Sequence, residues 1–369
     1  MKDLRKLPIL TKEIIRENYK KLTAKNIKKN SIIESHTSGS TGKPLRFILD
    51  KESNLIEAAH TFRGWSFGGY KLGDKVAFLR SYVPKDGEPL MYIIRRENIM
   101  YVSAYHLSDD VMRQYADAIN RFGSKLLIGY PSSIYIFADF LKRNNIRMKN
   151  INAIVTSSEM MLPQYREKIE SVFNIKVLDW YGSNEHVLAF SQCENNMGYH
   201  INSEYGILEV VDENENLVEN GAGSIIGTSL NNYAMPFIRY RTGDLCEKKL
   251  SQQCNCGRGL PIDVLRVHGR SDEILNFLGR SIPPINFYTL FYNIPNIIQF
   301  QLIQESAGSL IAKFVVSDSF SDDNKKAVTD GLASRIGQGV KLELQFVDKI
   351  ERNVSTGKIK CIINNFYKK

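Results

Sequence analysis

Long apolar runs are missing from this sequence of 369 residues, and cysteine is scarce. The most apolar stretch, residues 126–141, is interrupted by Gly129, Pro131, Ser132 and Ser133, so it falls short of the roughly 18 apolar residues that a membrane-spanning helix needs. Five cysteines are too few for a disulfide scaffold in a chain of this length, and the N-terminus carries charges where a signal peptide has its apolar core. We therefore expect a cytoplasmic protein without a membrane span.

Positive charge is concentrated at one end of the chain. The net charge is +9, and residues 1–30 hold ten Lys or Arg against three Asp or Glu, so this segment alone contributes +7. The same segment contains Ile14, Ile15, Tyr19 and Leu22 at helical spacing. We interpret it as an amphipathic helix with a solvated basic face, in preference to a membrane or nucleic-acid contact.

Apolar runs alternate with helical periodicity between residues 50 and 190, which is typical of an α/β fold with a largely parallel sheet. The predicted strands are Val76–Leu79, Leu126–Ile128, Ile151–Val155 and Ile175–Leu178, and the predicted helices span residues 108–121, 132–144 and 162–173. After about residue 200, short strand-like runs are separated by turn signals at Asn216 and Gly221–Gly223. This second pattern predicts an antiparallel, barrel-like section.

The pattern changes again near Arg270, Ser271 and Asp272. Beyond this point we expect a compact α+β unit, with strands at 298–304, 309–316, 341–347 and near the C-terminus and a helix at 323–337. The length of the chain also suggests more than one domain. We therefore predict a large domain over residues 1–270 and a small domain over residues 271–369.

The loop at residues 36–44, His-Thr-Ser-Gly-Ser-Thr-Gly-Lys-Pro, has the composition of a phosphate cradle. Gly39 and Gly42 allow backbone N–H groups to approach an anion, and Lys43 adds a positive charge. Hydroxyl donors come from Thr37, Ser38, Ser40 and Thr41. It is not a Walker A loop, because only two residues separate the glycines and Pro44 replaces the Ser or Thr that would hold Mg²⁺. Taken alone, the loop is equally well explained as an ordinary polar turn.

Four further segments follow the loop in a fixed order. They are Tyr181–Glu185 (YGSNE), Tyr240–Asp244 (YRTGD), Gly269–Asp272 (GRSD) and Asn353–Lys358 (NVSTGK). Together with the loop they resemble the adenylate-forming superfamily of acyl-CoA synthetases, luciferases and peptide-synthetase adenylation domains. The resemblance covers nearly the whole chain. It implies a large N-terminal domain, a small C-terminal lid that moves, and an active site between them.

The resemblance implies roles for the residues of an ATP site. It assigns Thr37, Ser38, Gly39, Ser40, Thr41, Gly42 and Lys43 to the phosphates. It assigns Ser158, Glu159, Tyr181, Gly182, Asp244 and Arg270 to the adenine and ribose. An aromatic ring such as Tyr181 can stack on a base, and a carboxylate such as Asp244 can accept hydrogen bonds from both ribose hydroxyls.

Two residues are expected to be catalytic. The resemblance assigns Glu185 to Mg²⁺ on the phosphates, and it makes Lys358 the cation that bridges the substrate carboxylate and the α-phosphate as charge builds in the transition state. Asp272 matches the hinge about which the lid rotates. In isolation each would be interpreted as an exposed, solvated charge, so these assignments rest on the ordered motifs.

Within the superfamily, the sequence is most similar to the phenylacetate–CoA ligase and capsule-biosynthesis branch. The segments that carry this similarity are Leu7–Lys12 (LPILTK), Gly129–Ser132 (GYPS), the YGSNE pentad and Cys254–Pro261 (CNCGRGLP). The sequence departs from the branch in one respect, because its members usually carry a longer region before the LPILTK segment.

Cys193, His200, Cys254 and Cys256 form a candidate zinc site. A thiolate pair together with a thiolate–imidazole pair would give a closed tetrahedral site, and Cys246 is an alternative ligand. Reduced structural cysteines are the competing interpretation. We favour structural zinc, which similar Cys and His positions in this branch support.

The predicted function is ATP-dependent activation of a small-molecule carboxylate to an acyl-AMP and pyrophosphate, followed by transfer to a thiol such as CoA or a carrier-protein arm. The expected cofactors are ATP, Mg²⁺ and structural Zn²⁺, and no nucleic-acid partner is expected. One alternative is an amide-forming or adenylyl-only ligase that acts on a polar or sugar carboxylate. A zinc-containing nucleic-acid binding protein is a second alternative, and it leaves the ordered motifs unexplained. A nucleotide-binding regulator without catalysis is a third, and the presence of Lys358 and Glu185 argues against it.

Overall fold

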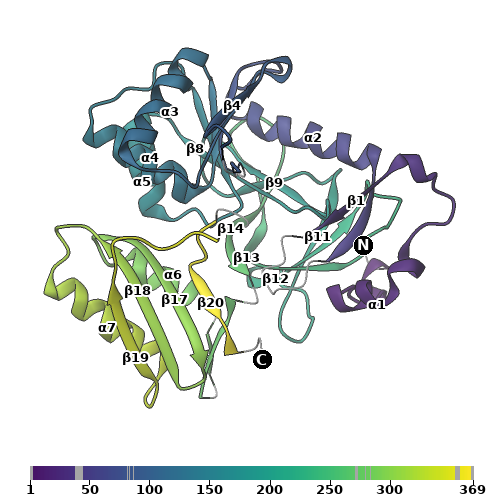
Figure 1. Ribbon diagram of the computed structural model, residues 1–369. Coiled ribbons are helices and arrows are strands. Elements are labelled where there is room, and N and C mark those ends of the chain that lie inside the picture. The colour runs from purple at the N-terminus through teal and green to yellow at the C-terminus, as the bar shows by residue number, and fades with distance from the viewer. Residues whose placement is uncertain are drawn as a thin grey trace.

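The structure is a computed structural model of the chain. It describes residues 3–37, 45–80, 82, 84–85, 87–270, 273–278, 280–282, 284–353 and 358–366. These residues form one 12-stranded mixed sheet, one four-stranded sheet and two pairs of strands, with helices packed on both sheets (Figure 1). The predicted fold class, an α/β protein with a small α+β C-terminal part, is confirmed.

Parallel strands form one half of the large sheet. In chain order this half contains β3 (Val76–Leu79), β4 (Met91–Ile94), β5 (Ile99–Val102), β6 (Leu126–Gly129), β7 (Ala153–Ser157) and β8 (Val177–Gly182). Their order in space is β4-β5-β3-β6-β7-β8, and only β4 runs antiparallel to its neighbour. Helices α3 (Asp109–Phe122), α4 (Pro131–Arg143) and α5 (Pro163–Phe173) follow β5, β6 and β7 in the chain. The strands and helices predicted between residues 76 and 178 are all present.

The parallel strands are continuously apolar because both faces of this half are covered. Leu127 and Ile154 pack with α3, α4 and α5 on one face. Ile128 and Val155 pack on the other face, with the end of helix α2 (Lys51–Ser66). Helix α2 is not predicted from the sequence, because its apolar residues follow no clear helical stripe.

Antiparallel strands continue the same sheet beyond β8. They are β9 (Ala189–Gln192), β10 (Tyr199–Ile201), β11 (Gly206–Val211), β12 (Gly221–Ser229), β13 (Tyr240–Gln252) and β14 (Ile262–Arg270). In space they follow β8 in the order β9-β10-β14-β13-β12-β11. The predicted antiparallel section is therefore joined to the parallel one through the β8–β9 pairing.

The N-terminal segment packs against this antiparallel half. It contains helix α1 (Lys12–Leu22) and the paired strands β1 (Ile32–His36) and β2 (Arg46–Asp50). The predicted amphipathic helix is present, because Ile15 is fully buried and Tyr19 and Leu22 pack on the same core. Ile14 lies outside that apolar face, with 39% of its surface exposed.

The C-terminal part of the chain forms its own four-stranded sheet. The strands are β17 (Ile297–Ser306), β18 (Ser309–Val316), β19 (Lys341–Phe346) and β20 (Ile362–Asn364), in the order β19-β18-β17-β20. Helices α6 (Pro284–Tyr292) and α7 (Asp322–Ile336) pack on it, and a short pair, β15 (Leu275–Phe277) and β16 (Arg280–Ile282), precedes it. The predicted boundary at residues 270–272 follows the end of β14, but Ser271 and Asp272 lie outside the described residues, so the domain limits stay a prediction.

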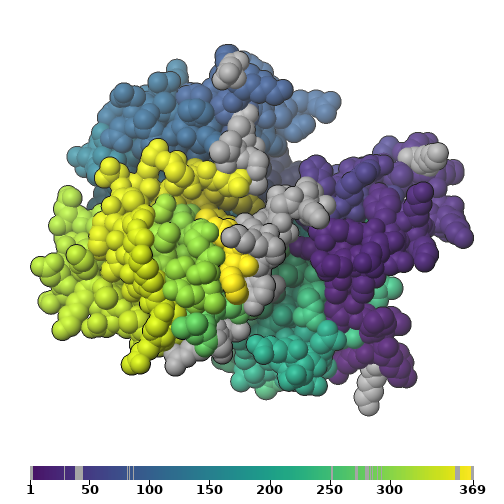
Figure 2. Space-filling view, turned by 60° about the horizontal axis from the view of Figure 1, so that its bottom comes forward, coloured from purple at the N-terminus to yellow at the C-terminus, as the bar shows by residue number. Residues whose placement is uncertain are grey.

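The C-terminal part packs closely against the α/β half. One apolar cluster runs from α4 and α5 through to the C-terminal sheet, with Tyr165 of α5 and the partly buried Cys361 both part of it. Figure 2 shows the C-terminal residues in yellow lying against both the blue and the green segments of the large body. Among the described residues, no helix is long and apolar enough to cross a membrane.

Candidate active site and metal centre

The carboxyl ends of the parallel strands meet at one edge of the large sheet, where α/β proteins bind ligands. Arg80 follows β3, Tyr130 follows β6, Ser158 follows β7, and Tyr181 lies at the end of β8. Ser158 has a φ of +71°, a left-handed conformation that is uncommon for a residue with a side chain. Such strain at a strand end marks this edge as a candidate site.

Tyr181, Asp244 and Arg270 are brought together from three strands. The Tyr181 hydroxyl donates a 2.7 Å hydrogen bond to Asp244 Oδ2, and Arg270 Nη1 lies 4.0 Å from Asp244 Oδ1. Asp244 and Arg270 are directly paired across β13 and β14. Gly243, with a φ of +86°, precedes Asp244 inside β13, where the pairing with β12 changes register. Three residues that the family resemblance assigns to the nucleotide are thus neighbours in space.

The ring of Tyr181 already has one packing partner. It stacks on Phe190 at a centroid distance of 4.8 Å and an interplanar angle of 19°. Burial and the neighbouring Asp244 carboxylate raise the pKa of Tyr181 well above its ordinary value, so the hydroxyl stays a donor. Gly182 follows at the strand end, where an added Cβ would lie 2.9 Å from Trp180 Nε1, so a larger residue would require the Trp180 ring to move.

Glu185 lies deeper than the nucleotide cluster. Its side chain is buried, and the Tyr240 hydroxyl donates a 2.9 Å hydrogen bond to Oε1. Burial raises the pKa of Glu185, and the hydrogen bond from Tyr240 opposes this rise. A cation near this carboxylate would stabilise its charged form, which suits the predicted contact with Mg²⁺.

Glu159 joins the C-terminal segment to the sheet edge. Its Oε1 accepts a 2.8 Å hydrogen bond from the backbone N–H of Ile359, and its Oε2 accepts a 3.2 Å bond from the N–H of Ser132 in the first turn of α4. Ile359 directly follows Lys358, whose Nζ lies 6.0 Å from the centre of the Tyr130 ring. Glu159 therefore holds the lysine segment against the strand ends.

The charge around Lys358 is mixed. Burial lowers the pKa of Lys358, the Glu159 carboxylate opposes this, and the cations Arg80 and Arg270 lower the pKa further. These neighbours come from strands at both ends of the candidate site. The lysine is thus within electrostatic reach of both Arg80 and the Asp244–Arg270 pair.

Several predicted residues fall outside the described part of the chain. They are Ser38, Gly39, Ser40, Thr41, Gly42, Lys43, Asp272 and the segment 354–357 that precedes Lys358. Thr37 is described, and it brackets the loop through 3.0 Å hydrogen bonds with Leu45 in both directions. Asn184 of the YGSNE segment donates a 3.4 Å bond to the carbonyl of His36, so the base of the loop adjoins the site.

The sequence does not predict two residues of this site. Arg80 is one, and it belongs to none of the five motifs; its signal is a basic residue placed directly after an apolar strand. Tyr240 is the other, since its motif was interpreted through Asp244 alone. Its buried hydroxyl is the partner of Glu185.

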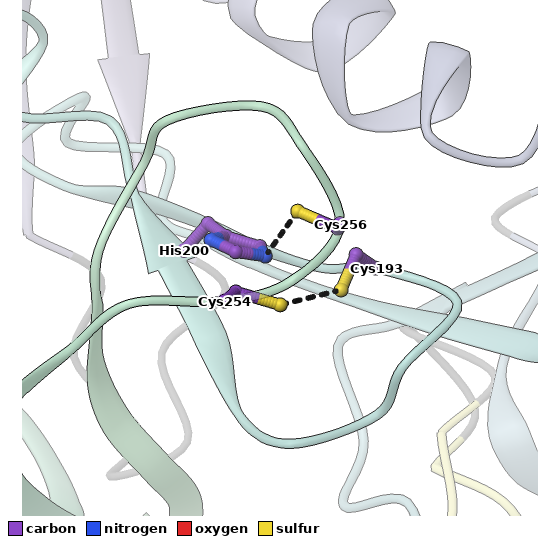
Figure 3. A group of neighbouring side chains, drawn as sticks. All are labelled: Cys193, His200, Cys254 and Cys256. Carbon is purple, nitrogen blue, oxygen red and sulfur yellow. Dashed lines mark hydrogen bonds between the residues drawn. The ribbon is translucent and has the colours of Figure 1, made fainter.

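The four predicted zinc ligands converge in space (Figure 3). They lie on the face of the large sheet that is opposite to helices α3, α4 and α5. The Sγ atoms of Cys193 and Cys254 are 3.6 Å apart, as are Cys256 Sγ and His200 Nε2, and all four ligand atoms lie within 4.8 Å of one another. Tetrahedral zinc with Zn–S bonds of about 2.3 Å places its sulfur ligands about 3.8 Å apart. The donor set therefore fits a closed zinc site.

A backbone contact orients the histidine of this cluster. The Nδ1 atom of His200 lies 2.9 Å from the carbonyl oxygen of Leu260, which leaves Nε2 directed toward Cys256. Such a contact is typical of metal-binding histidines. Cys246, the alternative ligand, is not part of the cluster, because it is buried in the separate core of the antiparallel half with Tyr240 and Val264.

Comparison with known proteins supports the resemblance drawn from the motifs. Residues 276–365 match the family of the CapK C-terminal domain. The chain is 28% identical to protein CapK of Staphylococcus aureus over 98% of this chain and 80% of that protein. It is 23% identical to the phenylacetate–coenzyme A ligase of Thermus thermophilus, over 84% of this chain and 71% of the ligase.

Solved structures of CoA ligases have the same fold as this chain. The chain superposes on 2-hydroxyisobutyryl-CoA ligase in its postadenylation state with a TM-score of 0.73 and 18% identity, covering 97% of this chain and 80% of the ligase. The predicted resemblance to adenylate-forming ligases of the phenylacetate–CoA ligase and CapK branch is therefore confirmed, and so is the fold class.

Proposed function

We propose that this protein activates a carboxylic acid with ATP, because it carries the ordered motifs of adenylate-forming enzymes and is similar over 84% of its length to a phenylacetate–coenzyme A ligase. The products of this step are an acyl-AMP and pyrophosphate. The observation that carries the proposal is the position of Lys358, whose segment Glu159 holds at the strand ends through the Ile359 N–H. Lys358 lies there within electrostatic reach of Asp244 and Arg270. A lysine of the C-terminal part and the proposed nucleotide-binding cluster thus lie at the same edge of the large sheet.

The chemistry proceeds by displacement at the α-phosphorus. A carboxylate oxygen of the acid forms a bond to the α-phosphorus, the bond from that phosphorus to the bridging oxygen breaks, and pyrophosphate leaves with the electron pair. Asp244 would accept hydrogen bonds from the ribose, and Tyr181 would pack on the adenine with the face not taken by Phe190. Bound Mg²⁺ would neutralise the phosphates, and Glu185 is the carboxylate proposed to support it.

Lys358 would bridge the two reacting groups. Its ammonium group can donate to the attacking carboxylate and to an α-phosphate oxygen at the same time, so it stabilises the charge that gathers between them. Burial strengthens this interaction because little water remains to screen it. The Glu159 contact contributes by fixing the position of the segment before ATP binds.

The acceptor of the acyl group is proposed to be a thiol, such as CoA or a carrier-protein arm. The relation to phenylacetate–CoA ligases supports this choice. Amide formation on a polar or sugar carboxylate is the second candidate, and the similarity to CapK supports it. Cys193, His200, Cys254 and Cys256 are proposed to hold a structural zinc ion, because their ligand atoms have tetrahedral spacing.

The test of the proposed function is ATP–pyrophosphate exchange with a panel of aryl, fatty, amino, sugar, hydroxy and dicarboxylic acids. We expect exchange with at least one class, and hydroxylamine should trap the acyl-AMP as a hydroxamate. Adding CoA or amines in place of hydroxylamine then distinguishes the two acceptors. Exchange with no class of acid would contradict the proposal.

Replacing the lysine tests the mechanism. Lys358→Ala is expected to lower exchange by orders of magnitude while ATP still binds, because the lysine acts mainly in the transition state. Lys360→Ala, two residues further along the same segment, is the matched control and should retain exchange. Full activity in Lys358→Ala would overturn the assignment.

A further inference from the structure

The segment Cys254–Pro261 (CNCGRGLP) contains a charged residue to which neither the zinc site nor the proposed active site assigns a role. The segment lies in the loop between β13 and β14, and it supplies two of the four zinc ligands. It also supplies the carbonyl oxygen of Leu260, which lies 2.9 Å from His200 Nδ1. In Figure 3 this loop curves over His200. The charged residue is Arg258, two positions after the second cysteine of the segment.

Two glycines fix the path of the backbone on either side of Arg258. Gly257 has a φ of +75° and Gly259 a φ of +71°. Both angles lie in the left-handed region, which glycine adopts at little cost. A Cβ added to either glycine would meet nothing within 4 Å in the described part of the chain, so the backbone angle rather than a lack of space favours glycine. The two turns together set the position of the arginine between them.

Arg258 connects three separate parts of the chain. Its Nη1 forms a 2.8 Å ion pair with Oε2 of Glu194, the residue after the ligand Cys193. Its Nη2 donates a 3.3 Å hydrogen bond to the carbonyl oxygen of Phe67, which directly follows α2. The guanidinium carbon also lies 4.5 Å from the centre of the Phe67 ring. The arginine therefore links its own loop to the loop after β9 and to the end of α2.

These contacts surround the zinc ligands directly. The guanidinium of Arg258 is within interaction range of the Cys256 sulfur. The Phe67 ring packs edge-on against the His200 ring, at a centroid distance of 5.9 Å and an interplanar angle of 89°. Phe67 thus contacts both the arginine and the histidine ligand. Residues that hold metal ligands from outside the ligand set fix their orientation and raise the affinity for the metal.

An ordinary surface ion pair is the competing explanation for Arg258. The side chains of Arg258 and Glu194 keep 25% and 46% of their surface exposed, so the pair by itself stabilises the protein little. The contacts with Phe67 and Cys256 are independent of Glu194. One of them reaches a ligand, and the other reaches the residue that packs on a ligand. These two contacts indicate a role at the metal site.

We propose that Arg258 positions the zinc ligands from outside the ligand set, by holding the loop of Cys254 and Cys256 against the end of α2. Arg258 is a positioning residue and contributes no ligand atom. Its planar guanidinium has donors in a fixed fork and can make several of these contacts at once, whereas a lysine ammonium is a point charge. The inference rests on the proposed zinc site, since it names a further residue of that site.

The zinc affinity of Arg258 variants provides the test. The zinc-loaded protein is titrated with a chelator of known affinity, and the competition gives the dissociation constant for zinc. Arg258→Met, which keeps the apolar stem of the side chain, should weaken zinc binding about ten- to a hundredfold, the usual effect of losing such an outer residue. Arg258→Lys should recover part of this loss, because it keeps the charge without the fork.

Two further variants serve as matched controls. Arg266→Met removes the same charge at an exposed position of β14 and should bind zinc as tightly as the wild type. Glu194→Gln breaks the exposed ion pair alone and should weaken zinc binding by no more than about fivefold. A large effect of Arg258→Met beside a small effect of Glu194→Gln separates the contacts at the metal site from the surface pair.

Thermal midpoints with and without zinc distinguish a role at the metal site from general stabilisation. Zinc-free Arg258→Met should unfold close to the midpoint of the zinc-free wild type. The increase in midpoint that zinc adds should be smaller in the variant, because this increase depends on the ratio of free zinc to the dissociation constant. If Arg258→Met does not fold, Arg258→Lys compared with Arg266→Lys carries the same test.

Two results would overturn the inference. One is an Arg258→Met variant that binds zinc as tightly as the wild type. The other is an equal loss of stability with and without zinc, which would make Arg258 an ordinary structural residue. A wild type that binds no zinc contradicts the zinc site itself and the inference with it, whereas tight zinc binding in every variant contradicts the inference alone.

Discussion

Asp179 is a buried carboxyl group in β8, two residues before Tyr181. Thr156 Oγ1 and the Tyr199 hydroxyl donate hydrogen bonds of 2.6 Å and 2.5 Å to its two oxygens. Burial raises the pKa of Asp179 from 3.8 to about 6 in spite of these bonds. Because the folded value lies above the unfolded one, the folded protein binds the extra proton between these two pH values. Its free energy of unfolding therefore falls as the pH rises through this window.

Asp179→Asn should remove this contribution, because an amide does not titrate. Relative to the wild type, the free energy of unfolding of the variant should increase from pH 4 to pH 6 and level off above, by an amount on the order of 3 kcal/mol. Urea unfolding at a series of pH values measures it. Asp330→Asn, at an exposed position of α7, is the matched control. A difference between Asp179→Asn and wild type that does not change with pH would contradict the assignment.

At the scale of secondary-structure elements, Glu159 connects three segments of the chain. It follows β7, and its carboxylate joins the first turn of α4 to the segment that leads into β20. Both oxygens are occupied by backbone N–H groups. These contacts suit a residue that positions Lys358. The family resemblance implies a different role for Glu159, namely contact with the adenine. The two roles predict different kinetics.

Glu159→Ala is expected to lower the maximal rate of pyrophosphate exchange about ten- to a hundredfold, which corresponds to losing a charge-assisted hydrogen bond of about 1.5–3 kcal/mol. The KM for ATP should change little, because the contact holds the lysine rather than the nucleotide. Glu167→Ala, an exposed carboxylate on α5, is the control. A large rise in the KM for ATP with an unchanged maximal rate would instead support the adenine role.

At the scale of the whole molecule, the Cys/His cluster joins parts of the chain that are distant in sequence. Cys193 follows β9, His200 lies in β10, and Cys254 and Cys256 lie in the loop between β13 and β14. These residues pack on the core beneath the end of α2, so a metal bound there would cross-link the antiparallel strands next to the parallel half.

Metal analysis of the purified protein should find one zinc ion per chain. Removing zinc with a chelator, or replacing Cys254 and Cys256 by Ser, should lower the thermal midpoint by several degrees, because binding to the folded state contributes to stability. Cys246→Ala should keep its zinc, since Cys246 lies in another core. A zinc-free wild type of unchanged stability would favour reduced structural cysteines.

Only part of the site could be predicted from the sequence. Tyr181, Asp244 and Arg270 could be placed together because each lies in an ordered motif, and the four zinc ligands could be placed together by residue type and spacing. Arg80 and the bridging contact of Glu159 could not be predicted. The contact of Glu159 with Ile359 joins residues that are 200 positions apart, and no local pattern records such a pair.

The sequence by itself determined the alternation of strands and helices, the identity of the motifs and the set of possible ligands, because periodicity and residue chemistry are local properties. Only the tertiary structure decided which of these residues meet. The pairing of β8 with β9 joins the two halves of the sheet, and the apolar contact of α5 with the C-terminal part brings Lys358 to the strand ends. Burial then separates residues of the same type, because Arg80 is partly buried beside the Phe78 ring whereas Arg96 is exposed at the surface.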